Sequence, residues 1–257
     1  MHRILIIGAG YDQLNAIKVA KKLGYYVLTT DVNPNAPGVS AADKFGHIST
    51  NDFAKTLEFA RTEKIDGITT VASENSIPII AKIAEELNLP GIGYETSIKA
   101  TNKVEMKKAF ATNDVLSPAY REINHFNELK DFVKSYSGPW VIKPSNSSGQ
   151  RGISYFNDTS NLEKLFHDAI AYATDNKAII EQFLEGPEIN VCAVVSYGHV
   201  KFLSVADRVT IPDKNFGIAI SHVYPSLLNT AQIEKVKNVS HHAITAIGLT
   251  NGIAYPQ

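Results

Sequence analysis

The sequence contains little that would suit an extracellular, membrane or nucleic-acid setting. Cys192 is the only cysteine in 257 residues, so no internal disulfide can form. The 25 basic and 26 acidic residues nearly cancel, which gives no sign of a nucleic-acid or anionic membrane partner. The opening stretch MHRILIIGAG has too short an apolar run for a signal peptide. We therefore expect a cytoplasmic protein without a nucleic-acid or membrane partner.

The length of the chain and its apolar share of 44% predict two domains with different patterns. From residue 3 to residue 90, apolar runs such as RILIIG alternate with helical stripes, which predicts an open, doubly wound parallel α/β sheet. Farther along, strands are joined by hairpin signals such as Tyr197-Gly198, with helices between them, which is an α+β pattern. We place the boundary near residue 116.

Two glycines follow the first expected strand, in the stretch IIGAGYDQ. Gly8 and Gly10 lie between a strand and a helix, and Asp31 ends the next strand about 20 residues later, as in a dinucleotide-binding site. Gln13 replaces the third glycine of that pattern, and such glycines also serve tight turns that bind no ligand. A dinucleotide site and a plain turn both stay open.

The stretch WVIKPSNSSGQRGISYF, residues 140–156, places a lysine between a strand and a loop of small polar residues. Trp140, Val141 and Ile142 predict a buried strand that Lys143 ends. Residues 145–152, here called the Ser/Gly loop, are too small and polar to pack in a core. Such a loop either turns the chain or binds an anion.

The stretch AIIEQFLEGPEINV, residues 178–191, predicts a strand, a hinge and a second strand. Purine recognition needs a backbone carbonyl and a backbone N–H side by side, which a hinge after a strand supplies. Glu188 begins the second strand, and a carboxylate there can accept hydrogen bonds from both ribose hydroxyls. Taken singly, Glu181 and Glu188 are better explained as solvated residues at strand ends.

In combination these motifs resemble the ATP-grasp superfamily, in particular its carbamoyl-phosphate-synthase-like and amino-acid-ligase-like members. The resemblance rests on the order of Lys103, Lys143 with the Ser/Gly loop, and EQFLEGPE at 181–188. It covers the whole chain. It implies an open, Rossmann-like α/β domain over residues 1–115, followed by an α+β ATP-grasp domain over residues 116–257, with a lid subdomain over roughly residues 117–184.

The resemblance also implies roles for single residues in binding a nucleotide. It assigns the cations Lys103 and Lys143 to the phosphates, and the Ser/Gly loop, with Ser148, Gly149 and Arg151, to a lid over the triphosphate. It assigns the adenine-binding hinge to Glu181, Gln182, Phe183 and Leu184, and the ribose to Glu188.

The chemistry implied by the resemblance is ATP-dependent ligation, with ATP and Mg²⁺ or Mn²⁺ as cofactors. A carboxylate attacks the γ-phosphate, and an amine or similar nucleophile captures the acyl phosphate. Arg208 is a candidate for holding a substrate carboxylate, although a surface ion pair explains it equally well. Gln257 falls at the first metal position of the family. We therefore expect a truncated chain that binds ATP without turning it over.

Two other functions remain open. One is a non-catalytic adenine-nucleotide-binding module that works with a partner chain, and the other is an NAD-dependent oxidoreductase built on the first domain. Small-molecule carboxylates and amines are the expected partners of a ligase, and a homodimer stays open as its assembly. The motifs do not identify the carboxylate or the nucleophile.

Overall fold

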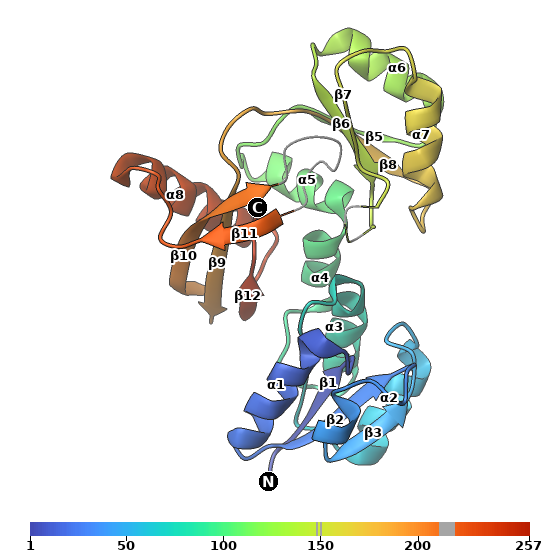
Figure 1. The fold of residues 1–257 in the computed structure, drawn as a ribbon, viewed down its shortest axis with the longest axis vertical. Coiled ribbons are helices and arrows are strands. Elements are labelled where there is room, and N and C mark those ends of the chain that lie inside the picture. Colours follow the sequence, from blue (N-terminus) through green and yellow to red (C-terminus); the bar gives the residue numbers. More distant parts are fainter. Residues whose placement is uncertain (148, 150, 211–218) are drawn as a thin grey trace. The chain divides into compact units, whose positions relative to one another are not determined.

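The computed structural model describes residues 1–147, 149, 151–210 and 219–257. The chain divides into two compact units, Met1–Thr101 and Asn102–Gln257 (Figure 1). The division falls before helix α5 (Lys103–Thr112), because α5 is bonded to the second unit: the Lys103 N–H donates to the Ser145 carbonyl oxygen at 2.8 Å. The domain boundary near residue 116 stays a prediction, and α5 is described here with the second unit.

The first unit is built on a four-stranded parallel sheet with the order β3-β2-β1-β4, which confirms the predicted α/β architecture. Its strands are β1 (Arg3–Ile7), β2 (Tyr26–Asp31), β3 (Lys44–His47) and β4 (Gly67–Thr70). Its helices are α1 (Tyr11–Lys22), α2 (Phe53–Glu63), α3 (Ile77–Glu86) and α4 (Tyr94–Thr101), with short 3-10 turns η1 (Val39–Ala41) and η2 (Glu74–Ser76). Strand β1 is apolar throughout its buried part because helices cover both faces of a parallel sheet.

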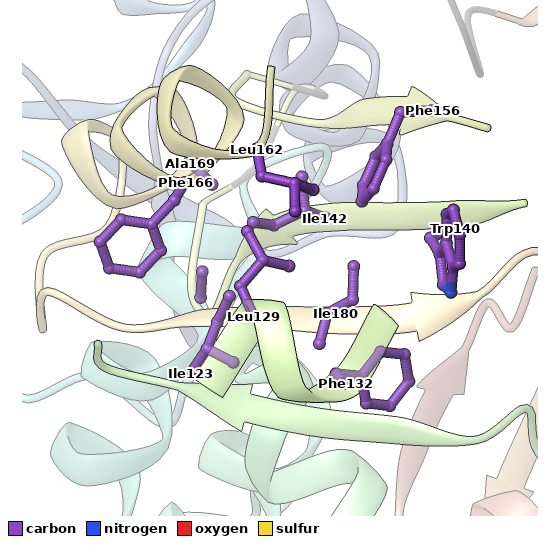
Figure 2. Packing of buried hydrophobic residues seen from close by; sticks show 11 residues of the cluster. Ile123, Leu129, Phe132, Trp140, Ile142, Phe156, Leu162, Phe166, Ala169 and Ile180 are labelled. Carbon is purple, nitrogen blue, oxygen red and sulfur yellow. The ribbon is translucent and has the colours of Figure 1, made fainter. Parts of the chain in front are cut away.

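The second unit contains two antiparallel sheets, in agreement with the predicted α+β pattern. The first sheet has the order β5-β8-β6-β7 and consists of β5 (Tyr120–Ile123), β6 (Trp140–Pro144), β7 (Ser154–Phe156) and β8 (Ala178–Gln182). Helices α6 (Phe126–Ser135) and α7 (Leu162–Ala171) pack against it (Figure 1). Figure 2 shows their shared core, in which Phe132, Leu129 and Phe166 of the helices meet Ile142 and Ile180 of the strands.

The second sheet has the order β11-β10-β9-β12, and helix α8 (Thr230–Ala246) lies between β11 and β12 in the sequence. Its strands are β9 (Ile189–Ser196), β10 (His199–Thr210), β11 (Ala219–Val223) and β12 (Gly252–Ala254). Tyr197 and Gly198 join β9 to β10 with positive φ values of 52° and 74°, the backbone of a type I′ hairpin, as the sequence predicts. No helix in the described part of the chain is long and apolar enough to cross a membrane.

We predict that Phe132→Ala destabilises the second unit by about 3–5 kcal/mol, because Phe132 is fully buried and its removal leaves a cavity. Urea unfolding followed by the fluorescence of Trp140 measures this loss, since Trp140 is the only tryptophan and lies in the same core. Phe202→Ala, at an exposed position of β10, is the matched control. Equal urea midpoints for the two variants would contradict the assigned core.

Candidate functional site

The Ser/Gly loop begins at Ser145, which forms hydrogen bonds to three other residues. Ser145 is fully buried, and its hydroxyl donates to Asp175 Oδ1 at 2.6 Å. Its N–H donates to the Lys177 carbonyl at 3.0 Å, and its own carbonyl accepts from the Lys103 N–H. Three separate segments, namely α5, β6 and the turn before β8, therefore meet at one residue and fix the start of the loop.

The other end of the Ser/Gly loop requires a glycine. Gly152 has a φ of +73°, and a Cβ there would lie 2.8 Å from Tyr172 Cδ2 and 2.9 Å from Pro144 Cγ. Between the two ends, Gly149 also has a positive φ of 67°, and both Gly149 and Arg151 are exposed. Exposed glycine backbone beside a cationic side chain is suited to contacting an anion.

Not every residue assigned to this loop can be placed. Ser148 lies outside the described residues, as does Gln150. Lys103 is partly buried, and its ammonium donates to the Ser147 carbonyl oxygen at 2.7 Å, so this predicted cation does lie against the loop.

Lys143, the residue before the last of strand β6, forms an ion pair with Glu181 of β8, with 2.5 Å between Lys143 Nζ and Glu181 Oε1. A second cation, Lys107 of α5, approaches the other carboxylate oxygen, with 2.9 Å between Lys107 Nζ and Glu181 Oε2. We call these three residues the Lys-Glu-Lys triad. The Glu181 side chain is only 8% exposed, so the expectation of a solvated strand-end residue is wrong in the structure.

The two lysines determine the charge state of the triad. Burial, the largest single influence on Glu181, would raise the pKa of its carboxyl, but the charges of Lys143 and Lys107 and their hydrogen bonds together lower that pKa. Burial lowers the pKa of Lys107, while the Glu181 carboxylate opposes that shift. The triad with all three groups ionised carries one net positive charge, at the strand end that leads into the Ser/Gly loop.

The hinge after β8 is bonded to two neighbouring segments at its start. The Gln182 N–H donates to the Ala119 carbonyl and the Phe183 N–H donates to the Pro139 carbonyl, at 3.0 and 2.9 Å. Leu184 follows with an exposed side chain, and its main chain takes part in none of the hydrogen bonds between described residues. The Phe183 ring packs edge-on against Tyr155, with 5.0 Å between centroids.

Two further predicted residues, Glu188 and Arg208, contact each other. Arg208 Nη1 donates to Glu188 Oε2, and the Arg208 N–H donates to the Glu188 carbonyl oxygen at 2.9 Å. The guanidinium side chain is 7% exposed and the carboxylate 43% exposed, so this is a half-buried pair and not a surface one. The Glu188 carboxylate thus faces solvent with part of its oxygen surface, while Arg208 holds its position.

Gln257, the predicted metal ligand, lies where the chain continues beyond β12 along β9, since the Val191 N–H donates to the Pro256 carbonyl at 2.9 Å. Among the described residues, no group of three or more His, Cys, Asp or Glu side chains is placed to hold a metal ion. One neutral amide does not suit Mg²⁺, which prefers carboxylate oxygens. The described residues therefore do not by themselves form a magnesium site, and no step below is built on one.

The glycine turn of the first unit is filled by its own side chains. Gln13 Oε1 accepts from the Gly10 N–H at 3.0 Å, and Gln13 Nε2 donates to the Val71 carbonyl. The Gln13 side chain lies over Gly8, so that a Cβ on Gly8 would be 3.1 Å from Gln13 Cδ. Asp31 Oδ2 accepts from the Ala9 N–H at 2.9 Å. These bonds favour the plain turn over a dinucleotide site, where the pyrophosphate would need this space.

Lys107, Asp175 and Tyr172 belong to the site and were not predicted from the sequence. Lys107 lies one helical turn after Lys103, and this i, i+4 spacing is the one signal that would have pointed to it. Asp175 and Tyr172 come from the segment between α7 and β8, far from the Ser/Gly loop in the sequence, and no local pattern marks them.

Comparison with known proteins finds a family match for part of the chain. Residues 101–216 match the family model of the phosphoribosylglycinamide synthetase ATP-grasp (A) domain. A phosphoribosylamine–glycine ligase of Methanocorpusculum labreanum is 26% identical over 209 residues, which are 77% of this chain and 47% of that protein. The chain spans less than half the length of the first curated relatives it matches.

Solved structures agree with the match. The phosphoribosylglycinamide synthetase of Anaerococcus prevotii is similar with a TM-score of 0.75 and 26% identity, over 99% of this chain and 63% of that one. The L-amino acid ligase of Bacillus licheniformis has the same fold with a TM-score of 0.81 and 23% identity, over 99% of this chain and 62% of that one. Residues 101–216 are thus similar to an ATP-grasp domain, and the fold of the chain as a whole is that of these solved structures.

Proposed function

We propose that this chain carries the adenine-nucleotide site of an ATP-dependent carboxylate–amine ligase. The observation that carries the proposal is the position of the Lys-Glu-Lys triad, with its net positive charge, at the strand end that leads into the glycine-containing Ser/Gly loop. A cation and exposed glycine backbone at one place suit a polyphosphate. Relatives named as amino acid, glycine and D-alanine ligases support the reaction class.

In this proposal the nucleotide is bound by three parts of the second unit. Lys103, Lys143 and the Ser/Gly loop, including Ser148, Gly149 and Arg151, contact the phosphates. The hinge at Glu181, Gln182, Phe183 and Leu184 binds adenine through main-chain groups, and Glu188 binds the ribose. Arg208 holds Glu188 in place. It is also the candidate for binding a carboxylate of the substrate through its guanidinium group.

The proposed reaction has two steps. An oxygen of the substrate carboxylate attacks the γ-phosphorus of ATP, the bond to the bridging oxygen breaks, and ADP leaves. The amine nitrogen of the second substrate then attacks the acyl carbon, and phosphate leaves with the bonding electrons while the amine loses a proton. Magnesium or manganese bound with ATP would neutralise the transferring phosphate. One solved neighbour, the biotin carboxylase domain of the Hydrogenobacter thermophilus 2-oxoglutarate carboxylase, is named as a complex with MgADP.

A second candidate function is a non-catalytic nucleotide-binding module that acts with a partner chain. It is favoured by one observation, namely that no group of acidic or histidine side chains among the described residues is placed to hold a metal ion. The two functions separate in one experiment: the chain is incubated with MgATP and a panel of carboxylates and amines, and ADP is measured. ADP formation that depends on both substrates supports the ligase, and ATP binding without ADP formation supports the module.

The nucleotide itself is tested by calorimetric titration with MgATP and with NAD. We expect MgATP to bind and NAD to bind weakly or not at all, because Gln13 fills the glycine turn of the first unit. Tighter binding of NAD than of MgATP would contradict the proposal.

We predict that Lys143→Ala weakens ATP binding by about 1.5–3 kcal/mol, the usual contribution of a hydrogen bond to a charged group. The fold should be retained, because Lys107 still neutralises Glu181 in this variant. Lys164→Ala, an exposed position on α7, is the matched control. Titration of both variants measures the effect, and unchanged affinity in a folded Lys143→Ala protein would remove Lys143 from the site.

We predict that Glu188→Ala weakens binding of ATP more than binding of 2′,3′-dideoxy ATP. The reason is that the partly exposed Glu188 carboxylate can accept from both ribose hydroxyls, which the dideoxy nucleotide lacks. Glu185→Ala, an exposed glutamate of the same segment, controls for loss of negative charge. Equal losses for the two nucleotides would show that Glu188 does not contact the ribose.

A further inference from the structure

One member of the Lys-Glu-Lys triad has no role in the nucleotide site described so far. Lys143 and Glu181 belong to motifs assigned to phosphate and hinge, whereas Lys107 belongs to neither. The Lys107 side chain is only 11% exposed, and its ammonium lies 2.9 Å from a carboxylate oxygen that is itself buried. Burying an ammonium group costs much of its hydration, and the ion pair with Glu181 offsets part of that cost.

The two lysines contact different oxygens of Glu181. Lys143 lies on Oε1 and Lys107 lies on Oε2, so either lysine can leave without displacing the other. If Lys143 turns toward a nucleotide phosphate, Glu181 keeps one counter-ion. Without Lys107, the same movement would leave a buried carboxylate unpaired, which is strongly unfavourable.

The surroundings of the two lysines differ in a way that lets Lys143 move to a phosphate while Lys107 stays on Glu181. Lys143 is the more exposed of the two, at 23%, and it is followed within two residues by the Ser/Gly loop. Lys107 projects from α5, whose start is bonded to Ser145 through the Lys103 N–H, and its ammonium lies 5.9 Å from the centre of the Tyr120 ring. Lys107 is thus fixed by its place on α5, whereas Lys143 lies next to the Ser/Gly loop.

We propose that Lys107 is a positioning residue that stays on Glu181 as its counter-ion and so releases Lys143 to bind a phosphate of a nucleoside di- or triphosphate. The inference rests on the proposed nucleotide site. The inference predicts that Lys107 affects the affinity of ligands with phosphates and of no others. Binding of ADP requires that Lys143 leave Glu181, and binding of adenosine does not.

The test compares the affinities of ADP and adenosine for the wild-type chain and for Lys107→Met, by calorimetry for ADP and by NMR line broadening for adenosine. We expect Lys107→Met to lower ADP affinity about tenfold or more and to leave adenosine affinity unchanged, because only ADP binding strips Glu181 of its last cation. Lys107→Arg should restore ADP binding. Lys108→Met, at the neighbouring and exposed lysine of α5, should change neither affinity.

Neutralising the carboxylate provides the decisive second comparison. In a Glu181→Gln background no buried carboxylate is left that needs a counter-ion, so adding Lys107→Met should not lower ADP affinity. The comparison of Glu181→Gln with the double variant also tests the inference if Lys107→Met alone fails to fold. A further loss of ADP affinity in the double variant would overturn the inference, since Lys107 would then act on the ligand directly.

Three other outcomes would count against the inference. Unchanged ADP affinity in Lys107→Met would overturn it, and so would equal losses for ADP and adenosine, which would show a general structural role. A wild-type chain that binds neither ligand would overturn the proposed nucleotide site and this inference together, whereas the first two outcomes leave that site standing.

Discussion

The buried carboxylate of Glu181 is the constraint on which the arrangement of the second unit depends. A carboxylate with 8% of its side chain exposed must be neutralised, and the two cations that do so come from α5 and from β6. Helix α5, which the chain joins directly to β5 of this sheet, is therefore also held against β6 and β8 by charge. A backbone hydrogen bond joins the start of α5 to Ser145, where the Ser/Gly loop begins. The ion pairs of Glu181 and this hydrogen bond together connect α5, β6, β8 and the loop.

Much of this could be predicted from the sequence because it depends on local patterns. The continuous apolar run of β1, the hairpin at Tyr197-Gly198 and the Lys143 strand end are all visible within a few residues, and all agree with the structure. The resemblance to the ATP-grasp superfamily was recognisable for the same reason, since it rests on the order of short motifs. Strand β3 was not predicted, because in the stretch KFGH only Phe45 is apolar and the strand lies at the sheet edge.

The parts that could not be predicted depend on contacts between distant segments. No property of Glu181 in the sequence shows that two lysines, 74 and 38 positions earlier, surround it (181 − 107 and 181 − 143). Asp175 reaches Ser145 across 30 positions, and Gln13 reaches Val71 across 58. Each of these contacts exists only after the sheets have formed. Sequence reasoning therefore found the groups proposed to bind a ligand more readily than the groups that hold them in place.

The hydrogen bonds at the base of the Ser/Gly loop bear on how the chain can vary in length. Connections between a helix and a strand ordinarily accept inserted residues, since they lie at the surface and carry few bonds. The segment between α7 and β8 does not fit that description: Thr174 bonds Asn146, Asp175 bonds the Ser145 hydroxyl, and the Lys177 carbonyl accepts from the Ser145 N–H. An insertion there would change the spacing of Thr174, Asp175 and Lys177. The hydrogen bonds that fix the start of the Ser/Gly loop would then be lost. Length variation among natural or engineered versions of this protein should therefore avoid residues 174–177, while remaining free at the exposed hairpin of β9 and β10.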